Sequence, residues 1–364
     1  MRYTRIILFL ICLSLTGCEL SQLDIKRRNE YLLRAQVYYR NQKYMNALSQ
    51  INFALDIDSD YKNALISKGW TLYYLKKYEE SQEIFEKVLE VDDTDPWLHY
   101  GLGSLYYKFA TLANAKVDKT RKLLLKSKYI KDRKAFEKDL KRYIKEKSMW
   151  IEKSLKHLKK SSDIDSKNIT LYKLIAVVYE SKGIKFYKTA IDFGDKYLKY
   201  LDKNLKVIKE YKVKNEEERL VPGLKKKKHE VLDRIIQDLE KQIDNNRKQY
   251  RIVQSLIAEW YYELAGIEYK KIEDLDKDSK KIKTCQQKLD QYTYEATKRI
   301  KLILKSAPHL ANYYRNLAEI AKLKKKYKLA TNYLKKYIKN YPLADPKTRV
   351  EVKMELKELQ SKKN

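Results

Sequence analysis

The spacing of small residues near the start of the chain is the feature that most constrains its fold. Ala35, Gly69 and Gly103 lie 34 positions apart. A large residue follows each of them three positions later, Tyr38, Leu72 and Tyr106. A small residue lets two helices approach closely, and a large residue one turn away fills the space beside it. With only eight glycines and five prolines in 364 residues, long helices are favoured over sheets, so an all-α chain of repeated helical hairpins is predicted.

This 34-residue helix-turn-helix pattern resembles the tetratricopeptide repeat (TPR). The match is closest for residues 28–61 and 62–95, and it returns at residues 311–344. The units between them are stretched. The resemblance implies an all-α, TPR-like solenoid (superhelix) of helical hairpins with elongated helices, a helical-arm insertion and a C-terminal capping helix.

The repeat pattern, the Pro-Gly step at residues 222–223 and the N-terminal residues analysed below divide the chain into eight predicted segments. They are a lipoprotein signal peptide (1–17), a lipidated tether (18–27), N-terminal TPR units (28–107), a basic helical arm (108–148), further TPR-like helices (149–220), a Pro-Gly break (221–224), a long helix with C-terminal TPR-like units (225–344) and a C-terminal capping helix (345–364). Polar residues 244–247 interrupt the apolar stripe of the long helix and predict a local bend there.

The predicted arm is an insertion in the third unit. Ser154 fits the repeat pattern only if about 39 residues have been added before it. The regular apolar spacing and the absence of Gly and Pro favour an antiparallel pair of helices over a disordered insertion, with a tip near residues 130–133. Six lysines characterise its surface: Lys119, Lys122, Lys126, Lys131, Lys141 and Lys145.

The N-terminal residues predict export and lipid attachment. Residues 1–5 contain two arginines and no acid, and residues 6–15 are apolar apart from one serine, which is too short to span a bilayer. The sequence Leu15-Thr16-Gly17-Cys18 resembles the lipobox of bacterial lipoproteins. That resemblance implies a covalent lipid on Cys18 and a chain anchored at the bacterial cell membrane, facing the periplasm or the cell exterior. Cys285 is then the only remaining thiol, so no intrachain disulfide is expected.

The formal charge of +31 comprises 64 lysines and 16 arginines against 49 acidic residues. Such a surface attracts polyanions. Export disfavours nucleic acid and leaves anionic lipid headgroups, anionic envelope polymers or an acidic protein. A second interpretation stays open, in which an AT-rich genome inflates lysine and tyrosine and the lysines merely solvate long helices.

Motifs for catalysis are lacking. The sequence has no Gly-rich phosphate loop, no H-E-x-x-H and no G-x-S-x-G, and its four histidines are widely separated along the chain. Separation in sequence does not exclude a site assembled by folding. We nevertheless expect no enzymatic activity, no metal, no small-molecule substrate and no cofactor beyond the lipid on Cys18.

The TPR resemblance implies that the first helix of each unit lines a concave groove. The predicted groove residues are Tyr39, Arg40, Trp70, Tyr73, Tyr74, Trp97, Tyr100 and Tyr107. Aromatic side chains bury a large area with few rotors, which suits binding of a peptide or helix. Packing of these rings against the arm or a neighbouring repeat is the competing interpretation.

The predicted function is an anchored protein-interaction scaffold or adaptor for an envelope assembly. In the alternative function, the basic arm binds anionic lipid or cell-wall polymer and the repeats form a stalk.

Overall fold

The computed structural model describes residues 20–168, 170–222, 226–275, 280–341 and 346–361. These residues form helices joined by short turns, and they belong to two compact units, Met1–Leu171 (unit 1) and Tyr172–Asn364 (unit 2). The predicted signal peptide, the lipobox with Cys18 and Gly223 of the Pro-Gly break lie outside the described residues.

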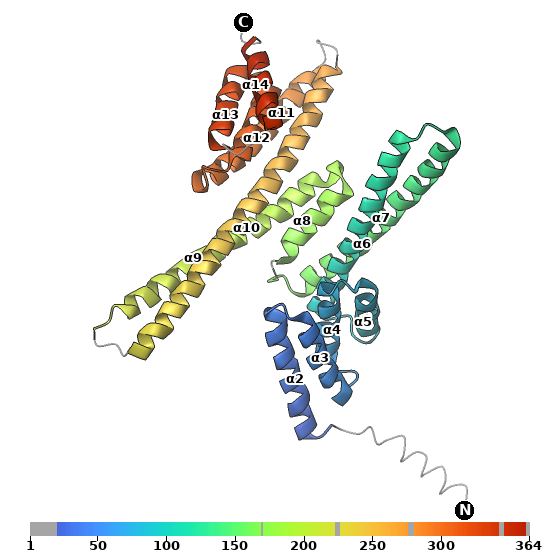
Figure 1. The fold of residues 1–364 in the computed structure, drawn as a ribbon, viewed down its shortest axis with the longest axis vertical. Coiled ribbons are helices and arrows are strands. Elements are labelled where there is room, and N and C mark those ends of the chain that lie inside the picture. The colour runs from blue at the N-terminus through green and yellow to red at the C-terminus, as the bar shows by residue number, and fades with distance from the viewer. Residues whose placement is uncertain (1–19, 169, 223–225, 276–279, 342–345, 362–364) are drawn as a thin grey trace, which may run out of the picture. The chain divides into compact units, whose positions relative to one another are not determined.

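Unit 1 consists of consecutive antiparallel hairpins (Figure 1). Its helices are α2 (Gln22–Arg40), α3 (Tyr44–Ile57), α4 (Lys62–Tyr74), α5 (Tyr78–Val91), α6 (Pro96–Lys126) and α7 (Ile130–Ile164). Each hairpin packs against the next, so the buried residues of each helix contact neighbours close in sequence.

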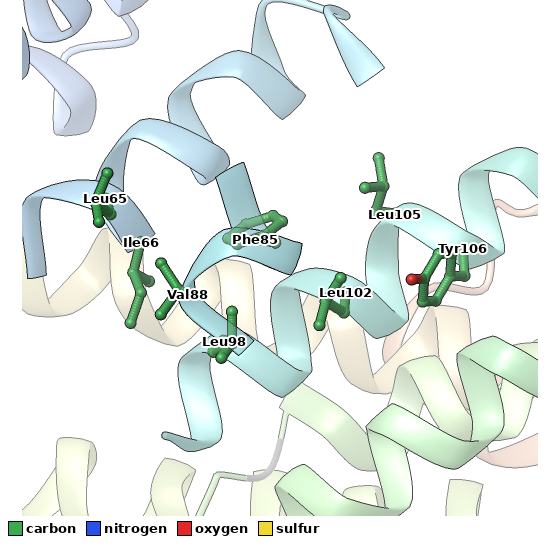
Figure 2. Packing of buried hydrophobic residues seen from close by; sticks show 8 residues of the cluster. All are labelled: Leu65, Ile66, Phe85, Val88, Leu98, Leu102, Leu105 and Tyr106. Atoms are coloured by element: carbon green, nitrogen blue, oxygen red, sulfur yellow. The ribbon is translucent and has the colours of Figure 1, made fainter. Parts of the chain in front are cut away.

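The 34-residue spacing of small residues marks close helix contacts. A Cβ atom added at Gly69 would lie 2.5 Å from the Phe85 ring, and one added at Gly103 would lie 2.5 Å from Leu158 Cδ2. The core beside these contacts combines three successive helices, as Figure 2 shows: Leu65 and Ile66 of α4, Phe85 and Val88 of α5, and Leu98, Leu102, Leu105 and Tyr106 of α6.

One hydrogen bond recurs in the second and third hairpins. The Ser81 hydroxyl donates to the Gly69 carbonyl at 2.8 Å, and the Ser154 hydroxyl donates to the Gly103 carbonyl at 2.7 Å. The bonded residues are 12 apart in one hairpin and 51 apart in the other, so the third hairpin contains 39 additional residues.

These additional residues extend α6 and α7 into a two-helix arm. Small and apolar residues of α6 are buried along it, including Ala113, Val117 and Thr120. The chain reverses at residues 127–129, immediately before the expected tip at 130–133. Residues 108–148 carry fifteen Lys and Arg side chains against five Asp and Glu, a formal charge of +10.

The first helix begins earlier than the repeat pattern predicts. α2 starts at Gln22 instead of residue 28, so residues 22–27 of the predicted tether are helical. Ser21 caps the helix because its side chain accepts a hydrogen bond from the Asp24 N–H. Only residues 18–21 of the predicted tether precede this helix.

Unit 2 contains longer helices and ends in a regular hairpin with a cap. Its elements are α8 (Thr170–Lys182), which begins at the boundary of the two units, η1 (Ile184–Phe186), α9 (Tyr187–Arg219), α10 (Lys226–Glu273), α11 (Lys280–Ser306), α12 (Ala311–Leu323), α13 (Tyr327–Asn340) and α14 (Pro346–Ser361). α10 continues as one helix of 48 residues through the polar patch at 244–247. α14 buries Val352 and Leu359 in a cluster with residues of α12 and α13. No helix among the described residues is both long enough and apolar enough to cross a bilayer.

Candidate partner-binding groove

A cavity of about 340 Å³ opens in unit 1. Its wall is formed mainly by α2, α4 and the start of α6, with one residue from α3. The lining residues are Ala35, Gln36, Tyr39, Arg40, Ile51, Ser67, Trp70, Thr71, Tyr74, Trp97 and Tyr100. Helix spacing explains this grouping, because positions three and four residues apart lie on one face of a helix.

A second hollow of about 310 Å³ shares part of this wall. Trp70 and Trp97 line both hollows, and Asn63 and Asp95 contribute polar edges to the second. The two hollows therefore form one concave surface, which we call the groove, along the first helices of three successive hairpins.

The aromatic side chains of the groove contact one another. Tyr74 packs face to face on Tyr44 with ring centroids 5.1 Å apart and edge to face on Tyr39 at 5.5 Å. Trp70 lies 5.1 Å from Tyr100, and Trp97 lies 6.0 Å from that same ring. Such contacts hold the rings in fixed orientations and reduce the entropy that a partner must remove on binding.

Six of the eight predicted groove residues line the cavity: Tyr39, Arg40, Trp70, Tyr74, Trp97 and Tyr100. Tyr73 is instead packed against Tyr78 and the α4–α6 core, with ring centroids 5.7 Å apart. Tyr107 is half-buried on α6 and is not part of the cavity wall. The groove prediction did not include Ile51 of α3, which lines the cavity, or Tyr44 of α3, which packs on Tyr74 beside it.

Burial raises the pKa of two hydroxyl groups in the groove. It raises the pKa of Tyr100, and together with the neighbouring Tyr74 hydroxyl it raises the pKa of Tyr39 well above its usual range. The exposed guanidinium of Arg40 supplies positive charge at one end of the wall. The surface is thus largely neutral and aromatic, with one basic edge.

One polar group in this wall has no partner. The indole nitrogen of Trp70 is buried and makes no hydrogen bond to any described residue. A buried N–H without an acceptor costs about 1–3 kcal/mol.

Folding also brings together two of the four histidines. His99 Nδ1 and His157 Nδ1 are 2.9 Å apart between α6 and α7, and His99 Nε2 donates to the Asp93 carbonyl at 2.7 Å. Because neutral His99 carries its hydrogen on Nε2, its Nδ1 accepts, and His157 Nδ1 donates the hydrogen bond between the two rings. Among the residues that the structure describes, no group of three or more His, Cys, Asp and Glu side chains is arranged to hold a metal ion.

The six lysines predicted for the arm are all exposed: Lys119, Lys122, Lys126, Lys131, Lys141 and Lys145. They follow the outer faces of α6 and α7 and do not line the groove. The groove and the arm are therefore two separate candidate surfaces within unit 1.

The turns within the hairpins decide the identity of the fold. Gln42, Lys76 and Lys325 have left-handed φ angles of 59°, 64° and 54°. In each turn the next residue donates its N–H to a carbonyl five positions earlier at 2.9 Å, as in a Schellman motif. These three residues occupy the same place in units 28–61, 62–95 and 311–344, and helices of 13 and 14 residues flank the last two. The fold is that of tetratricopeptide repeats. This confirms the predicted all-α, TPR-like fold class.

No protein-family model matches the sequence, and no curated protein matches it. The TPR fold also occurs among the solved structures that resemble this chain. A TPR protein of Thermus thermophilus is 13% identical, with 80% of this chain and 98% of that chain covered and a TM-score of 0.37. Pseudomonas aeruginosa PilF is 12% identical, with 93% and 99% covered and a TM-score of 0.47. YrrB, a TPR protein with an unusual peptide-binding site, is 18% identical, with 46% and 84% covered and a TM-score of 0.22.

Proposed function

We propose that this TPR protein is a lipid-anchored adaptor of the bacterial cell envelope that binds a peptide or helix of a partner protein in the groove of unit 1. The observation that carries the proposal is the continuous aromatic surface built by Tyr39, Trp70, Tyr74, Trp97 and Tyr100. A scaffold that presents a repeat surface to partners is the general role that a TPR fold supports.

The chemistry of the groove favours an internal segment with apolar or aromatic side chains. Stacked rings present apolar area that such a segment can bury. TPR proteins that bind a C-terminal carboxylate carry lysine at one position of the repeat. In this chain that position holds Leu32 and Ile66, which are buried. The groove therefore lacks the lysines that those proteins use for a terminal carboxylate, and its positive charge comes from Arg40 at one edge. No catalytic step, cofactor or small-molecule substrate enters this proposal.

In-cell photo-crosslinking tests the groove. A photoreactive amino acid at Tyr74, which is 44% exposed and lines the cavity, is expected to give a discrete adduct with one envelope protein. The matched control is Tyr211 of α9, which is 51% exposed and lies in the other unit.

The same crosslinking is then repeated with Trp97→Ala. Trp97 is 52% exposed, so its removal leaves the core intact, and the Tyr74 adduct is expected to fall at least tenfold. An adduct pattern identical at Tyr74 and Tyr211, or one insensitive to Trp97→Ala, would exclude the groove as the partner site.

Lipid attachment is tested separately. We expect incorporation of a palmitate analogue into the natural chain and none into Cys18→Ala, with loss of the variant from the membrane fraction.

The arm is the second candidate for the functional surface. Its formal charge of +10 suits an anionic lipid or cell-wall polymer, and the repeats would then form a stalk.

A further inference from the structure

The tip of the arm exposes large apolar side chains. Leu125 is 81% exposed, Tyr129 73% and Ile130 75%, all within the last turn of α6, the reversal at 127–129 and the first residue of α7. Further down the arm the apolar residues Ala113 and Val117 are buried between the two helices. The exposed group at the tip therefore contributes nothing to the packing of the arm and remains available for a contact.

Positive charge surrounds this apolar group. Residues 121–134 contain seven Lys and Arg side chains and one acidic residue. Lys126, Lys128 and Lys131 form no ion pair with any described residue, whereas Lys116 and Arg142 pair with Glu146 and Asp139 nearer the base. The charge at the tip is thus free to act on a partner.

The hairpin of α9 and α10 offers a comparison within the described residues. At the end of α9, Leu220 is 77% exposed and Val221 50% exposed. There, however, Glu218 pairs with Lys228 at 2.7 Å and Arg219 with Asp233 at 2.5 Å. Residues 216–228 contain five Lys and Arg side chains against three acidic ones, a formal charge of +2, whereas residues 121–134 carry +6.

We propose that the arm tip docks on the surface of an anionic lipid bilayer. Leu125, Tyr129 and Ile130 enter the headgroup region, and Lys126, Lys128 and Lys131 contact the lipid phosphates. Tyrosine favours the membrane interface because its ring is apolar and its hydroxyl is polar. A charged polymer would need the lysines alone, whereas a bilayer also accounts for the exposed apolar residues.

The arm tip and the start of α2 lie at opposite ends of unit 1 (Figure 1). The proposed anchor, which precedes α2, and the proposed docking site are therefore separate contacts. Docking of the arm tip requires neither the lipid anchor nor the groove. It narrows the second candidate function, in which the arm binds an anionic lipid or a cell-wall polymer, to the binding of a lipid bilayer.

Vesicle flotation with the chain from residue 20 onward tests this inference. We expect binding to vesicles containing phosphatidylglycerol and none to pure phosphatidylcholine. Replacing three lysines, Lys126→Gln, Lys128→Gln and Lys131→Gln, is expected to weaken binding roughly 100-fold, since each lysine near an anionic surface contributes about fivefold. Replacing the apolar group, Leu125→Ser, Tyr129→Ser and Ile130→Ser, is expected to weaken it at least tenfold with the charge unchanged.

The control is Leu220→Ser with Val221→Ser, which removes two exposed apolar residues from the turn of the α9–α10 hairpin and is expected to bind like the natural chain. A fluorophore on Ile130→Cys, in a Cys285→Ser background, is expected to shift its emission to the blue when anionic vesicles are added. Full binding by the apolar-tip variant would overturn the inference and leave a charge-driven polyanion site. Equal loss with the control variant, or no emission shift, would also overturn it.

Discussion

A glycine in α4 determines how closely that helix packs on α5. The Phe85 ring, which is fully buried, lies where the Cβ of any other residue at position 69 would project. We expect Gly69→Ala to lower the free energy of unfolding by about 1–3 kcal/mol, because overpacking outweighs the gain in helix propensity of about 1 kcal/mol. Gly266→Ala in α10 is the control, since no atom lies within 4 Å of its added Cβ. That variant is expected to gain up to about 1 kcal/mol.

Urea unfolding followed by circular dichroism measures both variants. A stability for Gly69→Ala equal to or above that of the natural chain would mean that Phe85 can move aside, and the close contact would then not determine the spacing of these helices.

The histidine pair makes the arm base sensitive to acid. Burial, the neighbouring His99 and nearby lysines lower the pKa of His157 to about 4, and burial lowers the pKa of His99. Unfolded histidine titrates near pH 6.5. Between about pH 6.5 and 4 the unfolded chain thus binds more protons than the folded chain, and stability falls by about 1–2 kcal/mol after allowance for solvent screening.

Urea midpoints at pH 7 and pH 4.5 test this dependence. His157→Gln keeps a neutral hydrogen-bonding group beside His99 and should lose part of the dependence. His229→Gln, in the other unit, should keep all of it. An unchanged pH dependence in His157→Gln would assign the acid sensitivity to other groups.

At the scale of elements, the arm is an extension of one repeat hairpin. The equivalent hydrogen bonds from Ser81 and Ser154 define its length as 39 residues. Replacing residues 109–150 with a copy of residues 75–77 shortens the chain by 39 residues. This restores the spacing of an ordinary repeat between Gly103 and Ser154. We expect this chain to keep cooperative unfolding of unit 1, reported by the fluorescence of Trp70 and Trp97.

The matched control adds one residue to the copied turn. One residue rotates the following helix by about 100°, which would turn Ser154 and Leu158 away from Gly103. This control is expected to unfold at lower urea than the in-register variant. Equal stability of the two variants would contradict the equivalence of Ser154 with Ser81.

Local spacing explains which elements could be predicted from the sequence. The repeat register and the arm follow from Gly69, Gly103 and Ser154, because small residues at helix contacts recur at fixed intervals. The start of α2 was missed although Ser21 and Asp24 form a helix-capping pattern that the sequence displays. The left-handed turn at Lys76 carries no glycine and so gave no signal.

The groove and the histidine pair depend on contacts that spacing alone does not determine. The TPR resemblance predicts Trp70, Tyr74 and Tyr100 at a groove, and all three line the cavity. It did not show that Tyr73 turns toward the core, because adjacent residues on a helix differ by about 100° in direction. His99 and His157 are 58 positions apart and meet only because the arm folds back on itself.

At the scale of the molecule, each unit depends on its own core. Phe85 is fully buried in the unit 1 cluster and Ile300 is 2% exposed in a unit 2 cluster. In repeat folds stability arises mainly from contacts between neighbouring hairpins, so damage in one core spreads to its neighbours and then stops. We expect Phe85→Ala, which costs about 3–5 kcal/mol, and Ile300→Ala, which costs about 2–5 kcal/mol, to act on different parts of the chain.

Amide hydrogen exchange of the intact chain measures where each substitution acts. Phe85→Ala should lower protection in α4–α6 and leave α10–α13 unchanged, and Ile300→Ala should do the reverse. The two variants control for one another, because each removes core contacts from one unit only. A uniform loss of protection in both units would show a single cooperative body. The expected local loss would mean that unit 1, with its groove and arm, keeps its structure when unit 2 opens.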